Sequence, residues 1–155
     1  IVLIKFIERT PEILLIKRGK EPFSGCWAIP GGFVEKNETV EEAAIRELSE
    51  ETGIADVPIL FSGIYSKPGR DPRGWVVSTA FLSLINYEPQ VNAGDDATSF
   101  AWFDIHNLPD LAFDHNEIIE KSIGIIKRIF YYDRYFYSVF KSIDEKEIIE
   151  LTKIL

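Results

Sequence analysis

The sequence predicts one globular domain with an α/β or α+β sandwich fold; the alternation of elements indicates the fold class, and length and composition indicate one globular domain. Short apolar segments typical of buried strands alternate along the chain with segments that carry a helical pattern. The length of 155 residues suits about one domain, which can bury roughly 70% of its unfolded surface. Apolar residues make up 46% of the chain and charged residues 27%, as in ordinary globular proteins.

The first elements are predicted to be strands. Residues 1–7 and 13–18 are apolar at alternate and at neighbouring positions, as in strands covered on both faces. A turn is expected between them, around Thr10-Pro11-Glu12. Residues 25–32 form a loop rich in glycine and proline that is expected to hold a short strand.

The clearest helix is predicted over residues 39–52. Thr39 and Glu42 have the spacing of a capping box at its start, and Gly53 follows its last turn. Both ends of this helix are therefore marked in the sequence.

Later strands are predicted over residues 59–65, 76–85 and 100–103. The segment 76–85 is expected to be a long apolar strand at the centre of the sheet, after a polar loop at 67–74. Asp114 is a candidate cap for a helix that reaches about Tyr131, and a last helix is predicted over 144–155.

Charge and composition argue against several classes of protein. Seventeen basic against 25 acidic residues give a net charge of −8, which disfavours sequence-independent binding to nucleic-acid phosphates. Residues 1–116 hold 18 acidic and 10 basic residues, so the whole excess lies there. Because no apolar run approaches about 18 residues, we expect neither a membrane span nor a secretory signal.

Cys26 is the only cysteine, which excludes an internal disulfide and a cysteine zinc cluster. A single thiol suits a reducing compartment, so we expect a cytoplasmic protein. The chain contains no methionine, even at position 1, and we therefore expect the natural protein to begin upstream.

Three carboxylates share one face of the predicted helix 39–52. Glu47, Glu50 and Glu51 stand at spacings of three and four residues. One interpretation is a solvated acidic face, helped by Arg46 four residues before Glu50. The other is a site for a hard divalent cation, Mg²⁺ or Mn²⁺, which prefers carboxylate oxygens.

The residues around these carboxylates resemble the Nudix box. Read from Gly32, the segment is GFVEKNETVEEAAIRELSEETGI. The matching positions are Gly32, Glu38, Arg46-Glu47-Leu48, Glu50-Glu51 and Gly53-Ile54. Nine fixed or restricted positions within 23 residues make this a strong signal.

The resemblance covers roughly residues 1–130, including the approach Trp27–Gly32. It implies an α/β/α sandwich around a mixed sheet, in which the box forms a loop, a helix and a second loop. It also implies hydrolysis of a nucleoside diphosphate linked to another moiety, with Mg²⁺ or Mn²⁺ as cofactor. The remaining residues, 131–155, are expected to be a C-terminal helical extension.

The resemblance also implies roles for residues of the box. Glu50 and Glu51 are implied as metal ligands, joined by Glu47 and the Gly32 carbonyl. Arg46 is expected to orient a carboxylate through a salt bridge, and Glu38 to support the loop. The implied catalytic set is Glu47, Arg46 and Glu50.

The polar loop at residues 67–74 is the second informative feature. Arg70 and Arg73 stand on a turn shaped by glycine and proline, where they can offer forked donors to a phosphate or stack on a base. The alternative is a solvated turn in which Arg70 pairs with Asp71.

This loop, with sequence GRDPRG, is similar to the ADP-ribose pyrophosphatase branch of the family, as are Gly94-Asp95-Asp96 and the segment Leu111–His115. The resemblance implies that ADP-ribose is converted to AMP and ribose 5-phosphate. Substrate-binding residues are then expected to be Arg70, Arg73 and, by stacking on adenine, Trp27. A hydrolase of damaged nucleotides is an alternative that shares the metal site but lacks the paired-arginine loop.

The general base has several candidates. Glu47 on the helix is one, and Asp95 or Asp96, in a loop that could fold over the metal, is another. His115 is interpreted as a helix-start residue and His106 as a turn residue.

A cluster of aromatic residues near the C-terminus predicts a partner surface. Seven aromatic residues fall within positions 130–140: Phe130, Tyr131, Tyr132, Tyr135, Phe136, Tyr137 and Phe140. Such a cluster needs a covering surface, and a homodimer is the simplest solution.

A second hypothesis for the tail comes from a different functional class. Some Nudix relatives carry a winged helix and act as ADP-ribose-sensing repressors, and residues 144–151 could begin such an appendage. The intact box and the zero net charge of the tail favour the enzyme. Nucleic acid is therefore an expected partner only if a further domain follows Leu155.

Overall fold

The structure is a computed structural model of the chain, and it describes residues 1–90, 97–132, 139–140 and 143–155. The strands are β1 (Val2–Ile7), β2 (Thr10–Arg18), β3 (Trp27–Ala28), β4 (Leu60–Tyr65), β5 (Ser78–Ile85) and β6 (Ala97–Asp104). The helices are α1 (Val40–Thr52), α2 (His115–Tyr132) and α4 (Glu145–Ile154).

In the described part of the chain, six strands form one mixed sheet. Its order is β3-β2-β1-β5-β4, and β6 pairs with β2. β1 runs parallel to β5, whereas the other neighbours are antiparallel. Because β6 lies along one side of β2 from Glu12 to Arg18, β1 and β3 share its other side. The backbone after β3 therefore lies beside the start of β1, where the Ile1 nitrogen donates to the Pro30 carbonyl at 2.8 Å.

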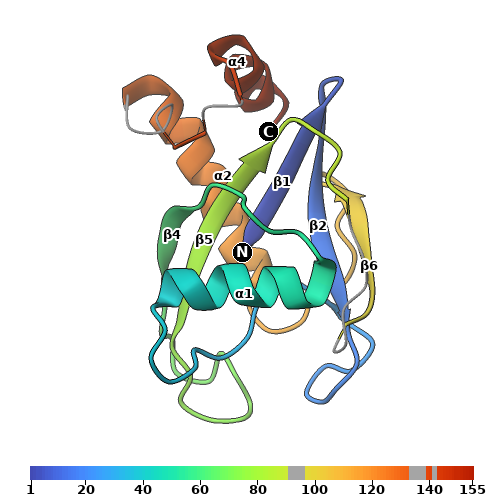
Figure 1. The fold of residues 1–155 in the computed structure, drawn as a ribbon, viewed down its shortest axis with the longest axis vertical. Coiled ribbons are helices and arrows are strands. Elements are labelled where there is room, and N and C mark those ends of the chain that lie inside the picture. The colour runs from blue at the N-terminus through green and yellow to red at the C-terminus, as the bar shows by residue number, and fades with distance from the viewer. Residues whose placement is uncertain (91–96, 133–138, 141–142) are drawn as a thin grey trace.

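Helices cover both faces of the sheet. α1 crosses the front of the sheet in Figure 1, and α2 lies behind it. On the α1 side, Leu48 packs in one apolar core with Leu3, Leu14 and Phe81. On the other side, residues of α2 and α4 join a larger core, among them Ile119 and Leu151. The expected α/β/α sandwich around a mixed sheet is confirmed.

Two local predictions need correction. The turn between the first strands lies at Glu8 and Arg9, not around Thr10-Pro11-Glu12, since β2 already begins at Thr10. Glu8 and Arg9 both have positive φ, 49° and 67°, as a two-residue hairpin turn requires. Neither residue type signals such a turn, whereas Pro11 does, and this misplaced the prediction by two residues.

The predicted central strand 76–85 begins two residues later, at Ser78. It is an inner strand between β1 and β4, but it contains hydroxyl side chains, of which Ser83 is fully buried. Val76 and Val77 precede it and line a cavity instead.

The tail packs on the domain in the part that the structure describes. Asp144 caps α4 in a capping box with Glu147, and Ile148 and Leu151 are fully buried. Of the predicted aromatic cluster, Phe140 is fully buried in the chain's own core. The other six aromatic side chains lie outside the described residues. Within the described residues, no helix is long and apolar enough to span a membrane.

Candidate active site

The position of α1 follows from its ends. The Thr39 hydroxyl accepts from the Glu42 backbone N–H at 3.2 Å, and the Glu42 carboxylate accepts from the Thr39 N–H at 2.7 Å. Gly53 ends the helix with φ of 74°, in the left-handed region that glycine tolerates best. With Leu48 buried against the sheet, the phase of the helix is fixed. Glu51 and Glu47 then lie next to the Gly31–Gly32 backbone, and the more exposed Glu50 pairs with Arg46.

Arg46 ties this helix to the loop before it. Its guanidinium donates two hydrogen bonds to Glu38, at 2.7 and 3.0 Å, and one to the Phe33 carbonyl at 3.1 Å. The same group donates to Glu47 at 2.9 Å and to Glu50 at 3.0 Å. The bonds from Arg46, with a further one from the Glu35 N–H, lower the pKa of Glu38 to about 2. Arg46 thus forms salt bridges to three carboxylates and ties the loop to the helix. The resemblance implies a salt bridge from Arg46 to a carboxylate and support of the loop by Glu38, and this geometry is compatible with both.

Glu51 is the most buried of the three carboxylates. It is 8% exposed and accepts a hydrogen bond from the Gly31 N–H at 2.9 Å. Burial, with a further contribution from the charge of Glu47, raises the pKa of Glu51 to about 7. The Glu47 carboxylate lies directly against the Gly32 backbone, so a Cβ at this position would displace it.

These groups fit a hard divalent cation in their chemistry. Three carboxylates and a backbone carbonyl are oxygen ligands of the kind that Mg²⁺ and Mn²⁺ take, and a buried carboxylate with a raised pKa gains from a nearby cation. Among the described residues, however, no three His, Cys, Asp or Glu side chains converge as a ready-made metal site. Arg46 holds Glu47 and Glu50, and Gly31 holds Glu51, so a cation would have to draw the carboxylates away from these bonds.

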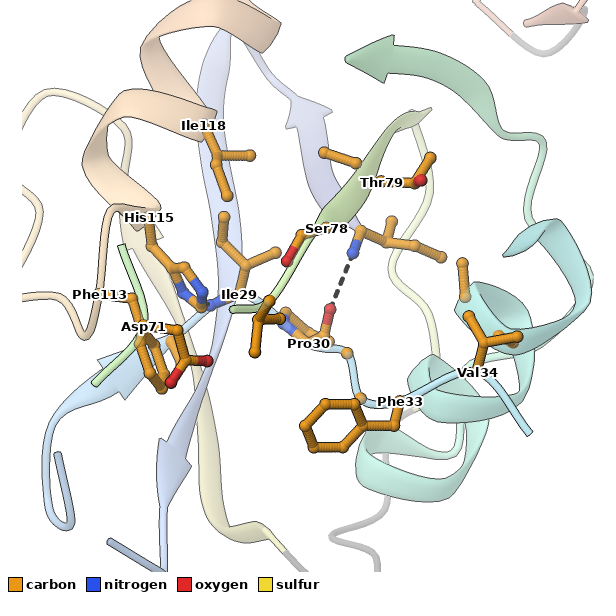
Figure 2. Close-up of a pocket in the computed structure, with 18 of the residues that line it drawn as sticks. Ile29, Pro30, Phe33, Val34, Asp71, Ser78, Thr79, Phe113, His115 and Ile118 are labelled. Atoms are coloured by element: carbon orange, nitrogen blue, oxygen red, sulfur yellow. Dashed lines mark hydrogen bonds between the residues drawn. The ribbon is translucent and has the colours of Figure 1, made fainter. Parts of the chain in front are cut away.

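A cavity of about 280 Å³ opens beside this cluster. Its lining joins the Gly31–Gly32 backbone to the loop of residues 67–74 and to the start of α2. In Figure 2, His115 and Phe113 lie on one side of Ile29 and Pro30, and Phe33 lies on the other. A small molecule in the cavity would therefore lie next to the carboxylate helix.

The two arginines of the loop have different surroundings. The Arg70 side chain is only 5% exposed and donates to both oxygens of Asp114, at 2.6 and 2.7 Å, and to the Ser78 hydroxyl at 2.6 Å. Its partner is thus Asp114 at the start of α2, not Asp71. These bonds occupy the guanidinium, which makes Arg70 a structural residue in this arrangement.

Arg73 takes the pairing with Asp71. It donates to both oxygens of that carboxylate, at 2.6 and 3.0 Å, and these bonds lower the pKa of Asp71. Its side chain stays 41% exposed, and its guanidinium lies 5.0 Å from the Phe33 ring and 5.3 Å from the Phe113 ring. Arg73 is therefore the loop arginine that remains accessible at the cavity.

Other predicted site residues lie elsewhere. Trp27 packs edge-on against Phe103, with ring centroids 4.8 Å apart, and is not among the described residues that line the cavity. Its ring is thus committed to packing in this structure. Asp95 and Asp96, the predicted alternative bases, lie outside the described residues.

Three cavity residues escaped the sequence prediction as site residues. Phe33 and Phe113 flank Arg73, and His115 lines the same space. An isolated aromatic residue or histidine resembles core packing in a sequence, so only their places beside the box and in the segment Leu111–His115 could have indicated them. His106, in contrast, is exposed in a turn, as predicted.

Comparison with known proteins identifies a family that the chain matches. The model of the NUDIX domain matches residues 1–122. The ADP-ribose pyrophosphatase of Methanocaldococcus jannaschii is 55% identical over 115 residues, which are 74% of this chain and 67% of that protein. The ADPR responsive transcriptional repressor NtrR of Acinetobacter baylyi is 35% identical over 118 residues, 73% of this chain and 47% of the repressor.

A solved structure with a bound ligand is also similar. The NUDIX domain of Shewanella oneidensis NrtR, in complex with ADP ribose, superposes with a TM-score of 0.71 at 27% identity. The match covers 79% of this chain and 84% of that one.

Proposed function

The chain belongs to the Nudix family, and we propose on that basis that it hydrolyses ADP-ribose to AMP and ribose 5-phosphate with the help of a divalent cation. The observation that carries the proposal is the carboxylate face of α1 against the Gly31–Gly32 backbone, beside a cavity. The M. jannaschii pyrophosphatase, at 55% identity, supports ADP-ribose as the substrate.

The cation, Mg²⁺ or Mn²⁺, would be held by Glu47, Glu50, Glu51 and the Gly32 carbonyl. When bound, it supplies charge neutralisation for the diphosphate and lowers the pKa of the attacking water. Arg46 keeps the loop of residues 33–38 fixed on α1 while the carboxylates turn toward the cation. Glu47 is one candidate for the base that takes the proton from water, and it lies in the described part of the chain. Asp95 and Asp96 are the alternatives.

The substrate would enter the 280 Å³ cavity. Arg73 is the accessible loop cation there, and its flat guanidinium can bind a phosphate oxygen or stack on a ring. Arg70 would act indirectly, since it holds the loop against Asp114.

The test compares two Glu→Gln substitutions on the same helix. We expect Glu50→Gln to lower kcat for AMP release at least about a hundredfold, because a charge and an anionic ligand are lost together. Glu41→Gln, on the exposed first turn of α1, is the matched control and should keep wild-type activity. AMP release is measured with Mg²⁺, with Mn²⁺ and with a chelator. A wild-type chain that releases no AMP with either metal would overturn the proposal.

A regulator that senses ADP-ribose is the second candidate, and the similarity to the A. baylyi repressor favours it. Such a protein needs to bind ADP-ribose but not to cleave it. Saturable binding of ADP-ribose by the wild-type chain without turnover in either metal would support the regulator over the enzyme.

We also propose a homodimer in a reducing compartment such as the cytoplasm. Support comes from the aromatic residues between positions 130 and 140 and from the single, unpaired Cys26. Because Phe140 is buried within its own chain, the interface would use other residues of that segment. Light scattering at micromolar concentration should give twice the 17.7 kDa chain mass, and a monomer would refute the dimer.

A further inference from the structure

His115 is fixed in place from two sides. It is the first residue of α2, directly after Asp114, whose carboxylate is held by both guanidinium bonds of buried Arg70. Its ring accepts a hydrogen bond at Nδ1 from the Ile29 backbone N–H at 3.0 Å. The ring therefore joins the start of α2 to the backbone that leads into Gly31 and Gly32.

The bond from Ile29 decides which ring nitrogen carries the proton. An imidazole nitrogen that accepts a hydrogen bond has no hydrogen of its own, so the neutral ring carries its proton on Nε2. A second proton, at Nδ1, would point at the Ile29 N–H and place two donors against each other. The geometry thus selects the neutral ring with an Nε2–H donor.

The Nε2–H group is available to the cavity. His115 lines the cavity, and within the described residues no protein acceptor bonds to Nε2. The described side-chain atoms that are fully buried without a hydrogen-bond partner belong to Tyr65, Ser83 and Trp102. His115 Nε2 is not one of them. The nitrogen consequently keeps some accessible surface on a ring that lines the cavity.

The charge state of the ring agrees with this geometry. Burial lowers the pKa of His115 to about 4, and the charges that face it belong to the Ile1 amino group, Asp114, Arg70 and Arg18. At neutral pH the ring is therefore an uncharged donor.

We propose that His115 is a substrate-binding residue whose Nε2–H donates a hydrogen bond to an oxygen or nitrogen acceptor of the nucleotide in the cavity. The identity of that nucleotide rests on the proposed function. A site built around a hydrogen bond discriminates against ligands that lack the acceptor, so His115 would contribute to substrate selection as well as to affinity.

The first test uses His115→Asn and His115→Gln. The asparagine Oδ1 can replace Nδ1 as acceptor for Ile29 but offers no donor at the Nε2 position. The glutamine amide reaches the Nε2 position instead. We expect His115→Asn to raise KM for ADP-ribose about tenfold, which is one hydrogen bond, with little change in kcat or melting temperature. His115→Gln should recover part of the loss in KM.

The matched control is His106→Asn, the other histidine of the chain, which is exposed in a turn away from the cavity lining. It should leave KM unchanged. Binding of ADP-ribose to the chelated wild-type and His115→Asn proteins, measured by calorimetry, should show the same difference without turnover.

Nitrogen NMR gives an independent readout. With two histidines in the chain, the His106 variant assigns both rings. We expect His115 to be protonated at Nε2 alone at pH 7, and its Nε2–H proton to shift when ADP-ribose is added. A ring protonated at Nδ1, or a wild-type KM and affinity in His115→Asn, would overturn the inference while leaving the hydrolase intact. A wild-type chain that neither cleaves nor binds ADP-ribose would instead overturn the proposed function and the substrate role of His115 with it.

Discussion

At the scale of single residues, three arginines differ in how many of their hydrogen-bond donors are already used within the fold. Arg46 and Arg70 spend their donors on carboxylates, carbonyls and a hydroxyl of the fold. Arg73 keeps a large exposed fraction beside two aromatic rings. Two arginines of one short loop thus differ, since Arg70 is bound within the fold and Arg73 stays accessible beside the cavity.

Separate substitutions should reveal this difference. We expect Arg70→Ala to lower the free energy of unfolding by about 3 kcal/mol, because it leaves the partly buried Asp114 carboxylate without its partner. Arg73→Ala should also lower the free energy of unfolding, because it removes the guanidinium from the Asp71 carboxylate, which is only 4% exposed, but unlike Arg70→Ala it should raise KM for ADP-ribose. Urea unfolding and steady-state kinetics of both variants measure the two effects. If Arg70→Ala is as stable as wild type and changes KM alone, the assignment of roles is wrong.

The pKa of Glu51 makes stability depend on pH. In the folded, metal-free chain it is about 7, above the usual 4.5, so the folded state binds more protons between these values. This group therefore favours folding less as pH rises through that window. We expect Glu51→Gln, which keeps an acceptor for the Gly31 N–H, to stabilise the chelated protein by about 2 kcal/mol at pH 8.

The control for this prediction is the same comparison at pH 5. His115 has the opposite effect, since its pKa is lowered, but it is present in both proteins and cancels in the difference. Urea unfolding of both proteins in chelator, at pH 5 and at pH 8, measures the difference in their free energies of unfolding. An equal effect of Glu51→Gln at pH 5 and pH 8 would show that Glu51 does not titrate as described.

At the scale of elements, helix-capping residues and the helical spacing of side chains made the helices predictable from the sequence. α1 and α4 begin within one residue of their predicted starts. For α1 the capping box at Thr39 and Glu42 marked that start in the sequence, and the structure shows a second capping box at Asp144. The carboxylate face could be predicted for the same reason, since spacing on a helix of known phase fixes which side chains are neighbours.

Contacts between distant segments could not be predicted in this way. Arg70 finds Asp114 across 44 positions, and Ile29 finds His115 across 86. No local pattern in the sequence encodes these pairs, because they depend on how the sheet brings the loop and α2 together. The site therefore divides into a box that spacing reveals and a cavity wall that only the fold reveals.

α4 provides a test of where the domain ends. Leu151 is fully buried and belongs to the same core as the strands. We expect Leu151→Ala to destabilise the whole domain by about 2–4 kcal/mol in a single cooperative transition, whereas Lys153→Ala, on the exposed side, should have little effect. A separate early transition of the tail, with the main transition unchanged, would instead support an independent extension after residue 130.

At the scale of the whole molecule, α1 depends on several strands of the sheet that it covers. Its core joins Leu3 of β1, Leu14 of β2 and Phe81 of β5. The cavity in turn joins the first residues of the chain to the start of α2. The candidate site is thus a property of the complete sandwich, although its signature occupies 23 residues.

The parallel pairing of β1 with β5 has a consequence for how the protein is made. Val2 pairs with Leu82, so the first strand leaves the ribosome long before this neighbour is synthesised. Contacts of such high sequence separation form slowly and leave apolar surface open in the meantime. The β1–β2 hairpin can form early, but α1 obtains its complete docking surface only when Phe81 and Ile85 arrive. A nascent chain that stalls before that point would carry the whole Nudix box on a helix whose packing surface is incomplete, and its exposed apolar side chains would need chaperone protection until the sheet closes.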